Sequence, residues 1–213
     1  MISFSGIDCS GKSTQIELLC KELERKGKNY KVVWSRGGYT PGIEFVKKII
    51  RGGRETSKEK HLAHSAKVNE NPMKRKILFL GSLMDLWLFY SIGLRLMGIG
   101  RTIICDRYIW DTYIDFKMKY PEYDFEKGVW WKLTLKTMVK PRPALCLFIP
   151  AEESMYRSTL KEEPFPEKIE VRQERINWYM KELKNNRWDY VIDATSSIDT
   201  VFSVIKERMG WET

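Results

Sequence analysis

Short runs of apolar and β-branched residues alternate along the chain with longer segments in which apolar side chains recur every three or four positions. The short runs are typical of buried strands, and the longer pattern is typical of amphipathic helices. The runs predict strands at residues 2–4, 30–34, 102–105, 144–149 and 189–192. The longer pattern predicts helices at residues 13–26, 42–50, 73–97, 109–119, 125–139, 152–160, 166–185 and 198–209. This alternation predicts an α/β fold with a five-stranded parallel sheet flanked by helices on both faces.

A long apolar segment at residues 77–99 approaches the length of a membrane-spanning helix. Asp85 and Arg95 interrupt it, and a spanning helix would have to hide both charges. A central helix packed within a protein can instead leave such charges at a polar cleft or at its ends. We therefore expect no membrane span.

The composition favours one intracellular domain. A chain of 213 residues with 43% hydrophobic residues suits a single domain over 1–213. The net charge of +9 favours acidic partners such as phosphorylated small molecules. The four cysteines form no C-x-x-C pair, which indicates neither a zinc site nor disulfides and favours a reducing compartment. The first apolar run is too short for a signal peptide, so we expect a cytoplasmic protein.

Residues 6–14 read GIDCSGKST and match the phosphate-binding pattern G-x-x-x-x-G-K-[ST] between a predicted strand and a predicted helix. Backbone amides of such a loop point inward at phosphates, and the following helix adds its positive end. Lys12 would reach the β- and γ-phosphates, and Ser13 would bind magnesium. We expect a nucleoside triphosphate to be bound by Gly6, Asp8, Cys9, Ser10, Gly11, Lys12, Ser13 and Thr14.

Charged residues also follow two other predicted strands. Asp106 and Arg107 end the strand at 102–105, and Arg36 follows the strand at 30–34 in a glycine-rich turn. The carboxyl ends of parallel strands share one edge of the sheet, so these side chains should meet the phosphate loop there. Asp106 can orient a magnesium-bound water, and the two arginines can grip a second phosphorylated ligand. Each arginine could instead form a structural salt bridge.

With these motifs the chain resembles the thymidylate kinase family of nucleoside monophosphate kinases over nearly its whole length. The likeness rests on the loop GIDCSGKSTQ, on Arg36, on Leu78-Phe79, on Asp106-Arg107-Tyr108 and on the sequence Ile-Asp-Ala-Thr at 192–195. It implies a P-loop fold and phosphoryl transfer from ATP, with Mg²⁺, to thymidylate.

The resemblance also implies roles for single residues. Asp8 would lie near the acceptor's sugar, Phe79 would stack on its base, and Arg36 and Arg107 would hold its phosphate. Lys12, Ser13 and Thr14 would hold ATP and magnesium, with Asp106 as the second metal-site residue. Adenine would lie beside the turn of Ala194 and Thr195. A short helical lid would span about 156–175, with Arg157, Lys161, Lys168 and Arg172 as its cations and Arg157 as the catalytic candidate.

The sequence departs from the family at several positions. Cys9 stands where some members carry a catalytic arginine, so the lid would supply that charge. Leu83 stands where thymine-reading members usually carry an arginine. Asp111 and Asp115 lie one helical turn apart in a segment where the family has small residues. They could bind sugar hydroxyls of the acceptor or a cation, or they could be merely solvated.

These departures leave alternatives open. One is a P-loop kinase of another small acceptor, such as a sugar or sugar phosphate, and another is a nucleotide-binding switch, although no N-K-x-D segment is present. The polar, basic segment 51–76 could be a flap over the substrate or a solvated loop. We expect no nucleic-acid partner, since aromatic residues at helical spacing are typical of a core. Met84, Trp87, Leu88 and Leu94 could pair two copies in a homodimer.

Overall fold

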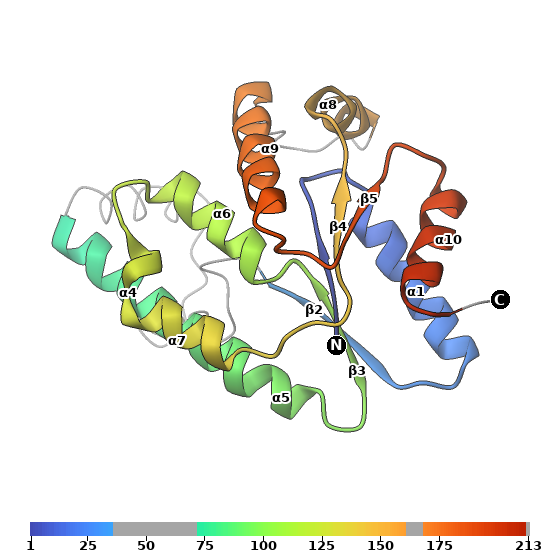
Figure 1. Ribbon diagram of the computed structural model, residues 1–213, viewed down its shortest axis with the longest axis horizontal. Coiled ribbons are helices and arrows are strands. Elements are labelled where there is room, and N and C mark those ends of the chain that lie inside the picture. Colours follow the sequence, from blue (N-terminus) through green and yellow to red (C-terminus); the bar gives the residue numbers. More distant parts are fainter. Residues whose placement is uncertain (36–71, 161–167, 212–213) are drawn as a thin grey trace, which may run out of the picture. The chain divides into compact units, whose positions relative to one another are not determined.

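The structure is a computed structural model that describes residues 1–35, 72–160 and 168–211 (Figure 1). Its centre is a sheet of five strands: β1 (Ile2–Ser5), β2 (Tyr30–Trp34), β3 (Thr102–Asp106), β4 (Ala144–Phe148) and β5 (Tyr190–Asp193). The strand order is β2-β3-β1-β4-β5, and every neighbouring pair is parallel. Each predicted strand is confirmed to within one residue at either end, and so is the parallel five-stranded sheet.

The chain divides into two compact units, and the sheet belongs to the first (Met1–Arg36, Met97–Tyr123 and Lys140–Thr213). Five helices of this unit flank the sheet: α1 (Lys12–Arg25), α6 (Ile109–Lys119), α8 (Ala151–Leu160), α9 (Ile169–Lys184) and α10 (Ile198–Arg208). In Figure 1, α1 and α10 cover one face while α6 and α9 lie on the other. One apolar core joins strand residues Phe4 and Leu147 to Leu19 of α1, Tyr179 of α9 and Ile205 of α10. Burial on both faces explains why β3 and β4 are mostly apolar, while β1 buries Ser3 and Ser5 beside Ile2 and Phe4.

The register of β1 and β3 brings two predicted motifs together. Phe4 of β1 pairs with Asp106 of β3, so the phosphate loop after β1 and Arg107 after β3 leave the sheet side by side. The main-chain N–H of Arg107 donates to Phe4 O at 2.8 Å and fixes this junction. The site is therefore positioned by a local pairing of two buried strands.

The second unit (Gly37–Leu96 and Asp124–Val139) is helical in its described part. It contains α4 (Pro72–Leu88), a π-helical turn η1 (Phe89–Gly93), a 3₁₀ turn η2 (Phe125–Lys127) and α7 (Val129–Thr137), and α5 (Leu94–Met97) follows η1. The prediction of one helix over 125–139 is wrong, because Gly128 adopts an extended conformation (φ −72°, ψ 154°) between η2 and α7. A Cβ atom at Gly128 would lie 3.0 Å from Phe125 O, so the glycine suits this break.

The structure describes only part of the predicted basic insertion (51–76) and of the predicted lid (156–175). Residues 72–76, the end of the predicted basic insertion, form the start of α4 rather than a loop. The rest of that insertion, the helix predicted at 42–50 and Arg36 lie outside the described residues. Within the lid range, residues 161–167 with Lys161 lie outside them as well.

The apolar segment around α4 and α5 forms a continuous helical run, Arg75–Met97, which is long and apolar enough to cross a membrane; 39% of its most apolar window is buried. Core helices of water-soluble proteins have the same length and hydropathy. Within this unit Phe79 packs edge-on against Phe125, with ring centroids 5.7 Å apart, and Trp87 packs against Trp130. These contacts are those of a core helix, and the absence of a membrane span stays a prediction.

Candidate active site

The phosphate loop depends on backbone conformations that glycine supplies. Gly6 has φ 140°, and a Cβ atom there would lie 2.3 Å from Leu147 O. Gly11 has φ 89° and caps the N-terminus of α1. Cys9 also adopts a left-handed conformation, with φ 61°. Left-handed residues within such a loop turn successive N–H groups toward one side and create a concave anion site.

Lys12 is folded back on the loop that carries it. Its ammonium donates to Gly6 O at 2.9 Å and to Ile7 O at 2.7 Å, and the side chain is buried. Burial lowers the pKa of Lys12 to about 8, with a smaller contribution from the positive charge of Arg107. A desolvated cation at this position attracts an anionic ligand strongly, since little solvent remains to be displaced from it.

The loop and the ends of two strands enclose a polar pocket of about 200 Å³. Its lining contains eight of the predicted site residues and one aromatic residue, Trp34 at the end of β2, which is 50% exposed. The lining residues are Asp8, Cys9, Ser10, Gly11, Lys12, Ser13, Trp34, Asp106 and Arg107. The pocket thus brings together the donor and metal residues predicted from separate motifs.

Asp106 has the features of an oxygen ligand for a hard cation. Its Oδ1 is buried and, within the described part of the chain, accepts no hydrogen bond. Burial raises the pKa of Asp106, while Lys12 and Arg107 counteract this effect. No group of three or more His, Cys, Asp and Glu among the described residues could hold a metal. Asp106 and Ser13 in one pocket fit Mg²⁺, which usually takes few protein ligands and completes its shell with phosphate oxygens and water.

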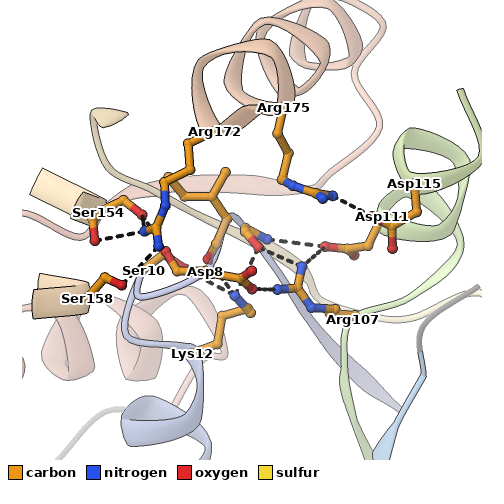
Figure 2. A network of polar contacts seen from close by, with 12 residues as sticks. Asp8, Ser10, Lys12, Arg107, Asp111, Asp115, Ser154, Ser158, Arg172 and Arg175 are labelled. Atoms are coloured by element: carbon orange, nitrogen blue, oxygen red, sulfur yellow. Dashed lines mark hydrogen bonds and ion pairs between the residues drawn. The ribbon is translucent and has the colours of Figure 1, made fainter. Parts of the chain in front are cut away.

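Arg107 is buried at the back of the pocket in a left-handed conformation with φ 72°. Its guanidinium donates to Gly6 O at 3.0 Å and to the carboxylate of Asp8, and it lies 3.6 Å from Asp111 Oδ1 (Figure 2). The structural ion pair considered for this residue is therefore present. Contact with an acceptor phosphate stays a prediction for Arg107.

Asp111 lies beneath the loop rather than on a solvated helix face. Oδ2 accepts from Ser5 Oγ at 2.6 Å and from the N–H of Tyr108 at 3.0 Å. Oδ1 accepts from Tyr179 Oη at 2.5 Å and from the N–H of Gly6 at 3.3 Å. Burial and the nearby carboxylate raise the pKa of Tyr179, so its hydroxyl stays a donor. Asp111 thus joins α6, α9 and the loop, and its contact with the acceptor is untested.

The other predicted polar residues lie on α6, α8 and α9. Asp115 forms an ion pair with Arg175 of α9. Arg157 of α8 donates to Glu153 at 2.7 Å and to Ala194 O at 2.9 Å, which joins the lid to the predicted adenine turn. Within that turn Thr195 donates twice to Asp193, and these hydrogen bonds lower the pKa of Asp193.

Arg172 is the most deeply buried of the lid cations that the structure describes. Its guanidinium donates to Ser154 Oγ at 2.6 Å and to Ser158 Oγ at 2.9 Å. Figure 2 shows it between these two serines of α8. Lys168, by contrast, is exposed at the N-terminus of α9.

Phe79, which is predicted to stack on the acceptor's base, and Leu83, which replaces the arginine of thymine-reading members, belong to the second unit. Both side chains are buried, and the ring of Phe79 contacts Phe125. Their roles toward a substrate stay predictions.

Three residues of the site were missed from the sequence: Trp34, Ser154 and Tyr179. Trp34 ends a predicted strand beside Arg36, and this position was a usable signal. Ser154 and Tyr179 lie on helices without any motif, and the contact of Ser154 with the loop joins residues 146 positions apart. Local patterns carry no information about such a contact.

Comparison with known proteins extends these local observations to the whole chain. The family described as thymidylate kinase matches residues 4–205. A thymidylate kinase of Bartonella henselae is 25% identical over 97% of this chain and 93% of its own length. Thymidylate kinases of Thermosipho africanus and Plasmodium falciparum are 25% and 26% identical, over 96% and 97% of this chain and 94% and 88% of their own lengths.

Proposed function

Since this chain belongs to the thymidylate kinase family and is a nucleotide kinase, we propose that it transfers the γ-phosphoryl group of ATP to thymidylate. A phosphate oxygen of thymidylate attacks the γ-phosphorus while the bridging P–O bond breaks, which yields ADP and thymidine diphosphate. The observation that carries the proposal is the family match over 4–205, which includes the phosphate loop and the last strand. The names of the relatives do not favour a sugar kinase or a nucleotide-binding switch.

In this proposal the loop binds the triphosphate through its inward amides and Lys12. Lys12 exchanges its two carbonyl acceptors for phosphate oxygens, which compensates its burial with charge-assisted hydrogen bonds. Ser13 and Asp106 would hold Mg²⁺, which would supply positive charge against the phosphates of ATP. The buried Oδ1 of Asp106 supports that assignment.

The acceptor is proposed to lie against Asp8 and Arg107, with Arg36 and Phe79 as further contacts. Arg107 already makes two hydrogen bonds with loop atoms, so its guanidinium is held in one orientation before any ligand arrives. An oriented guanidinium loses little entropy when it binds a phosphate. Asp111 and Asp115 are proposed to act near the acceptor as well, with Asp111 positioned by its contacts beneath the loop.

The lid is proposed to supply the positive charge that Cys9 cannot. Arg157 is the candidate, because its guanidinium is partly exposed and is held at Ala194 O beside the proposed adenine turn of Ala194 and Thr195. A cation at the transferred group stabilises its charge and helps to exclude water.

A homodimer is proposed on the basis of an exposed apolar stripe in the second unit. Its members recur every three or four positions on one side of the helical run: Ile77, Leu80, Met84, Leu88, Ile92 and Leu96, each more than 40% exposed. Such a stripe is typical of a protein interface. Leu94 is buried, so it does not belong to this surface, and Trp87 makes a hydrogen bond with Thr137.

The cytoplasm is the proposed location, supported by four free thiols and by the need for ATP. We also propose that the chain works as one kinase domain over 1–213.

The direct test of the proposed function measures ADP formation from Mg-ATP with thymidylate, other nucleoside monophosphates and sugar phosphates. We expect thymidylate to be turned over fastest, and EDTA to abolish the reaction. Lys12→Ala is the matched control, which should lose turnover and keep its fold by circular dichroism. Tight ATP binding without thymidylate turnover would contradict the proposal. In that case Leu83→Arg should be tested for a gain in thymidylate use.

A further inference from the structure

A chain of hydrogen bonds, buried at Arg172 and partly buried at Asp8, runs from α9 through α8 to the phosphate loop. Arg172 donates to Ser154 Oγ at 2.6 Å, and Ser154 Oγ donates to the carbonyl oxygen of Asp8 at 2.8 Å. Ser154 is fully buried and Arg172 is 1% exposed. The hydrogen bond between these two buried side chains is therefore strong and holds its geometry.

Arg172 determines which way the Ser154 hydroxyl points. A guanidinium can only donate, so Ser154 Oγ must accept from it and direct its own proton elsewhere. The carbonyl oxygen of Asp8 accepts the hydrogen bond from this hydroxyl. The guanidinium also donates to Ser154 O at 2.9 Å, through the same Nη1, and to Ser158 Oγ at 2.9 Å, through Nη2. The direction of the bond to the loop is thus fixed by three contacts on α8.

Fixing the carbonyl of Asp8 also fixes the amide of Cys9. A trans peptide is planar, and its C=O and N–H point in opposite directions. With the Asp8 carbonyl turned toward α8, the N–H of Cys9 is turned away from it, and Cys9 lines the phosphate pocket. The left-handed φ of 61° at Cys9 shows that this orientation is not the relaxed one for a cysteine.

The two preceding carbonyls are held differently. Those of Gly6 and Ile7 accept from Lys12, which must turn to the phosphates when ATP binds. The bond from Ser154 ends on the main-chain carbonyl of Asp8. A carbonyl oxygen cannot donate to a phosphate, so this bond can persist when ATP binds. The bond from Ser154 thus anchors the loop to α8, the helix whose C-terminal end belongs to the lid range.

We propose that Ser154, oriented by Arg172, is a positioning residue that turns the Cys9 amide toward the phosphates of ATP. This inference rests on the proposed function, because it concerns the triphosphate of that reaction. It assigns to Arg172 a place in the support of the loop, whereas the family resemblance implied a cation of the lid.

The test compares Ser154→Ala with Ser158→Ala. Both remove a buried hydroxyl that accepts from Arg172, but the bond to the Asp8 carbonyl comes from Ser154. Loss of one buried hydrogen bond predicts a Kd for ATP roughly five- to tenfold higher in Ser154→Ala. We expect the KM for thymidylate to change less than about twofold in both variants, and the Kd for ATP to stay near wild type in Ser158→Ala.

Ser154→Thr separates positioning from stability. Its extra methyl group should lower Tm at this fully buried position, whereas its hydroxyl should keep the Kd for ATP within about twofold of wild type. The inference would be overturned if the Kd for ATP rose in proportion to the fall in Tm across the three variants. It would also be overturned if Ser158→Ala lost as much ATP affinity as Ser154→Ala. Because titration calorimetry with ATP needs no turnover, this result can be read even if thymidylate is not the acceptor.

Discussion

Replacing Lys12 by methionine should stabilise the ligand-free protein while it abolishes phosphoryl transfer. Burial lowers the pKa of Lys12 from 10.5 to about 8, so the charged form is disfavoured in the folded state. This difference corresponds to about 3 kcal/mol at neutral pH. The two carbonyls that lose Lys12 each keep a donor, because Gly6 O accepts from Arg107 at 3.0 Å and Ile7 O accepts from the N–H of Ser10 at 3.3 Å. The gain in the free energy of unfolding should therefore not be cancelled by unpaired carbonyl groups.

The effect has a definite pH dependence. Below the folded pKa of about 8, Lys12 is charged in both states and destabilises the fold fully. Above the unfolded value of 10.5 it is neutral in both states and contributes nothing. The free energy of unfolding of the wild type therefore rises, as far as Lys12 contributes, when the pH increases from about 8 to 10.5. The advantage of Lys12→Met should shrink from about 3 kcal/mol near pH 7 to about 1 kcal/mol near pH 9.5.

Urea unfolding of both proteins at the two pH values, without nucleotide, measures this difference. In a separate thermal unfolding experiment near pH 7, the Tm of Lys12→Met should exceed that of wild type by roughly 5–10 °C. The kcat/KM of wild type for ATP should also fall as pH rises through about 8, since that constant reports groups of the free enzyme. A variant less stable than wild type, or a difference that does not change with pH, would refute the reasoning.

Three further predictions concern other parts of the molecule. Asp111→Ala should lower the free energy of unfolding by about 2–4 kcal/mol, because it leaves the buried donors of Ser5, Tyr179 and neighbouring amides without their acceptor; an unchanged urea midpoint would count against that network. Asp106→Asn should lower kcat at least ~100-fold at saturating Mg²⁺ while it keeps Tm; near-normal turnover would remove the proposed metal role. Met84→Glu should convert a dimer to monomers in sedimentation experiments, and a wild-type monomer at micromolar concentration would exclude that interface.

The strands and the loop could be predicted because their signals are local. A buried strand in a parallel sheet is largely apolar on both faces, so β3 and β4 are visible as apolar runs. In β1 the apolar residues Ile2 and Phe4 alternate with buried serines, and the phosphate loop that follows marks the strand. The helix at Ile109–Lys119 was predicted at both ends. The break at Gly128 and the π-helical turn at Phe89–Gly93 were missed, since both segments keep an apolar helical pattern. Packing and backbone geometry decide these interruptions, and periodicity does not record them.

The site was predictable in the same uneven way. Lys12, Asp106 and Arg107 follow strands in recognisable order, and the register of β1 and β3 brings them into one pocket. Asp111 was noticed from the sequence, but its burial beneath the loop was not foreseen. That position depends on Tyr179, which is 68 residues away along the chain. Contacts of this kind arise from the packing of α6 and α9, so they need a structure.

The charges at the pocket bear on the proposed role of the lid. The lining carries two cations, Lys12 and Arg107, and two carboxylates, Asp8 and Asp106, so these groups sum to zero before any ligand binds. A triphosphate and a monophosphate add several negative charges to this neutral site. Cys9 offers no charge where an arginine would help, and Mg²⁺ can neutralise only part of the excess. In the proposed reaction Arg157 supplies part of the remaining positive charge, and a cation brought toward the phosphates would favour the closed state over the open one.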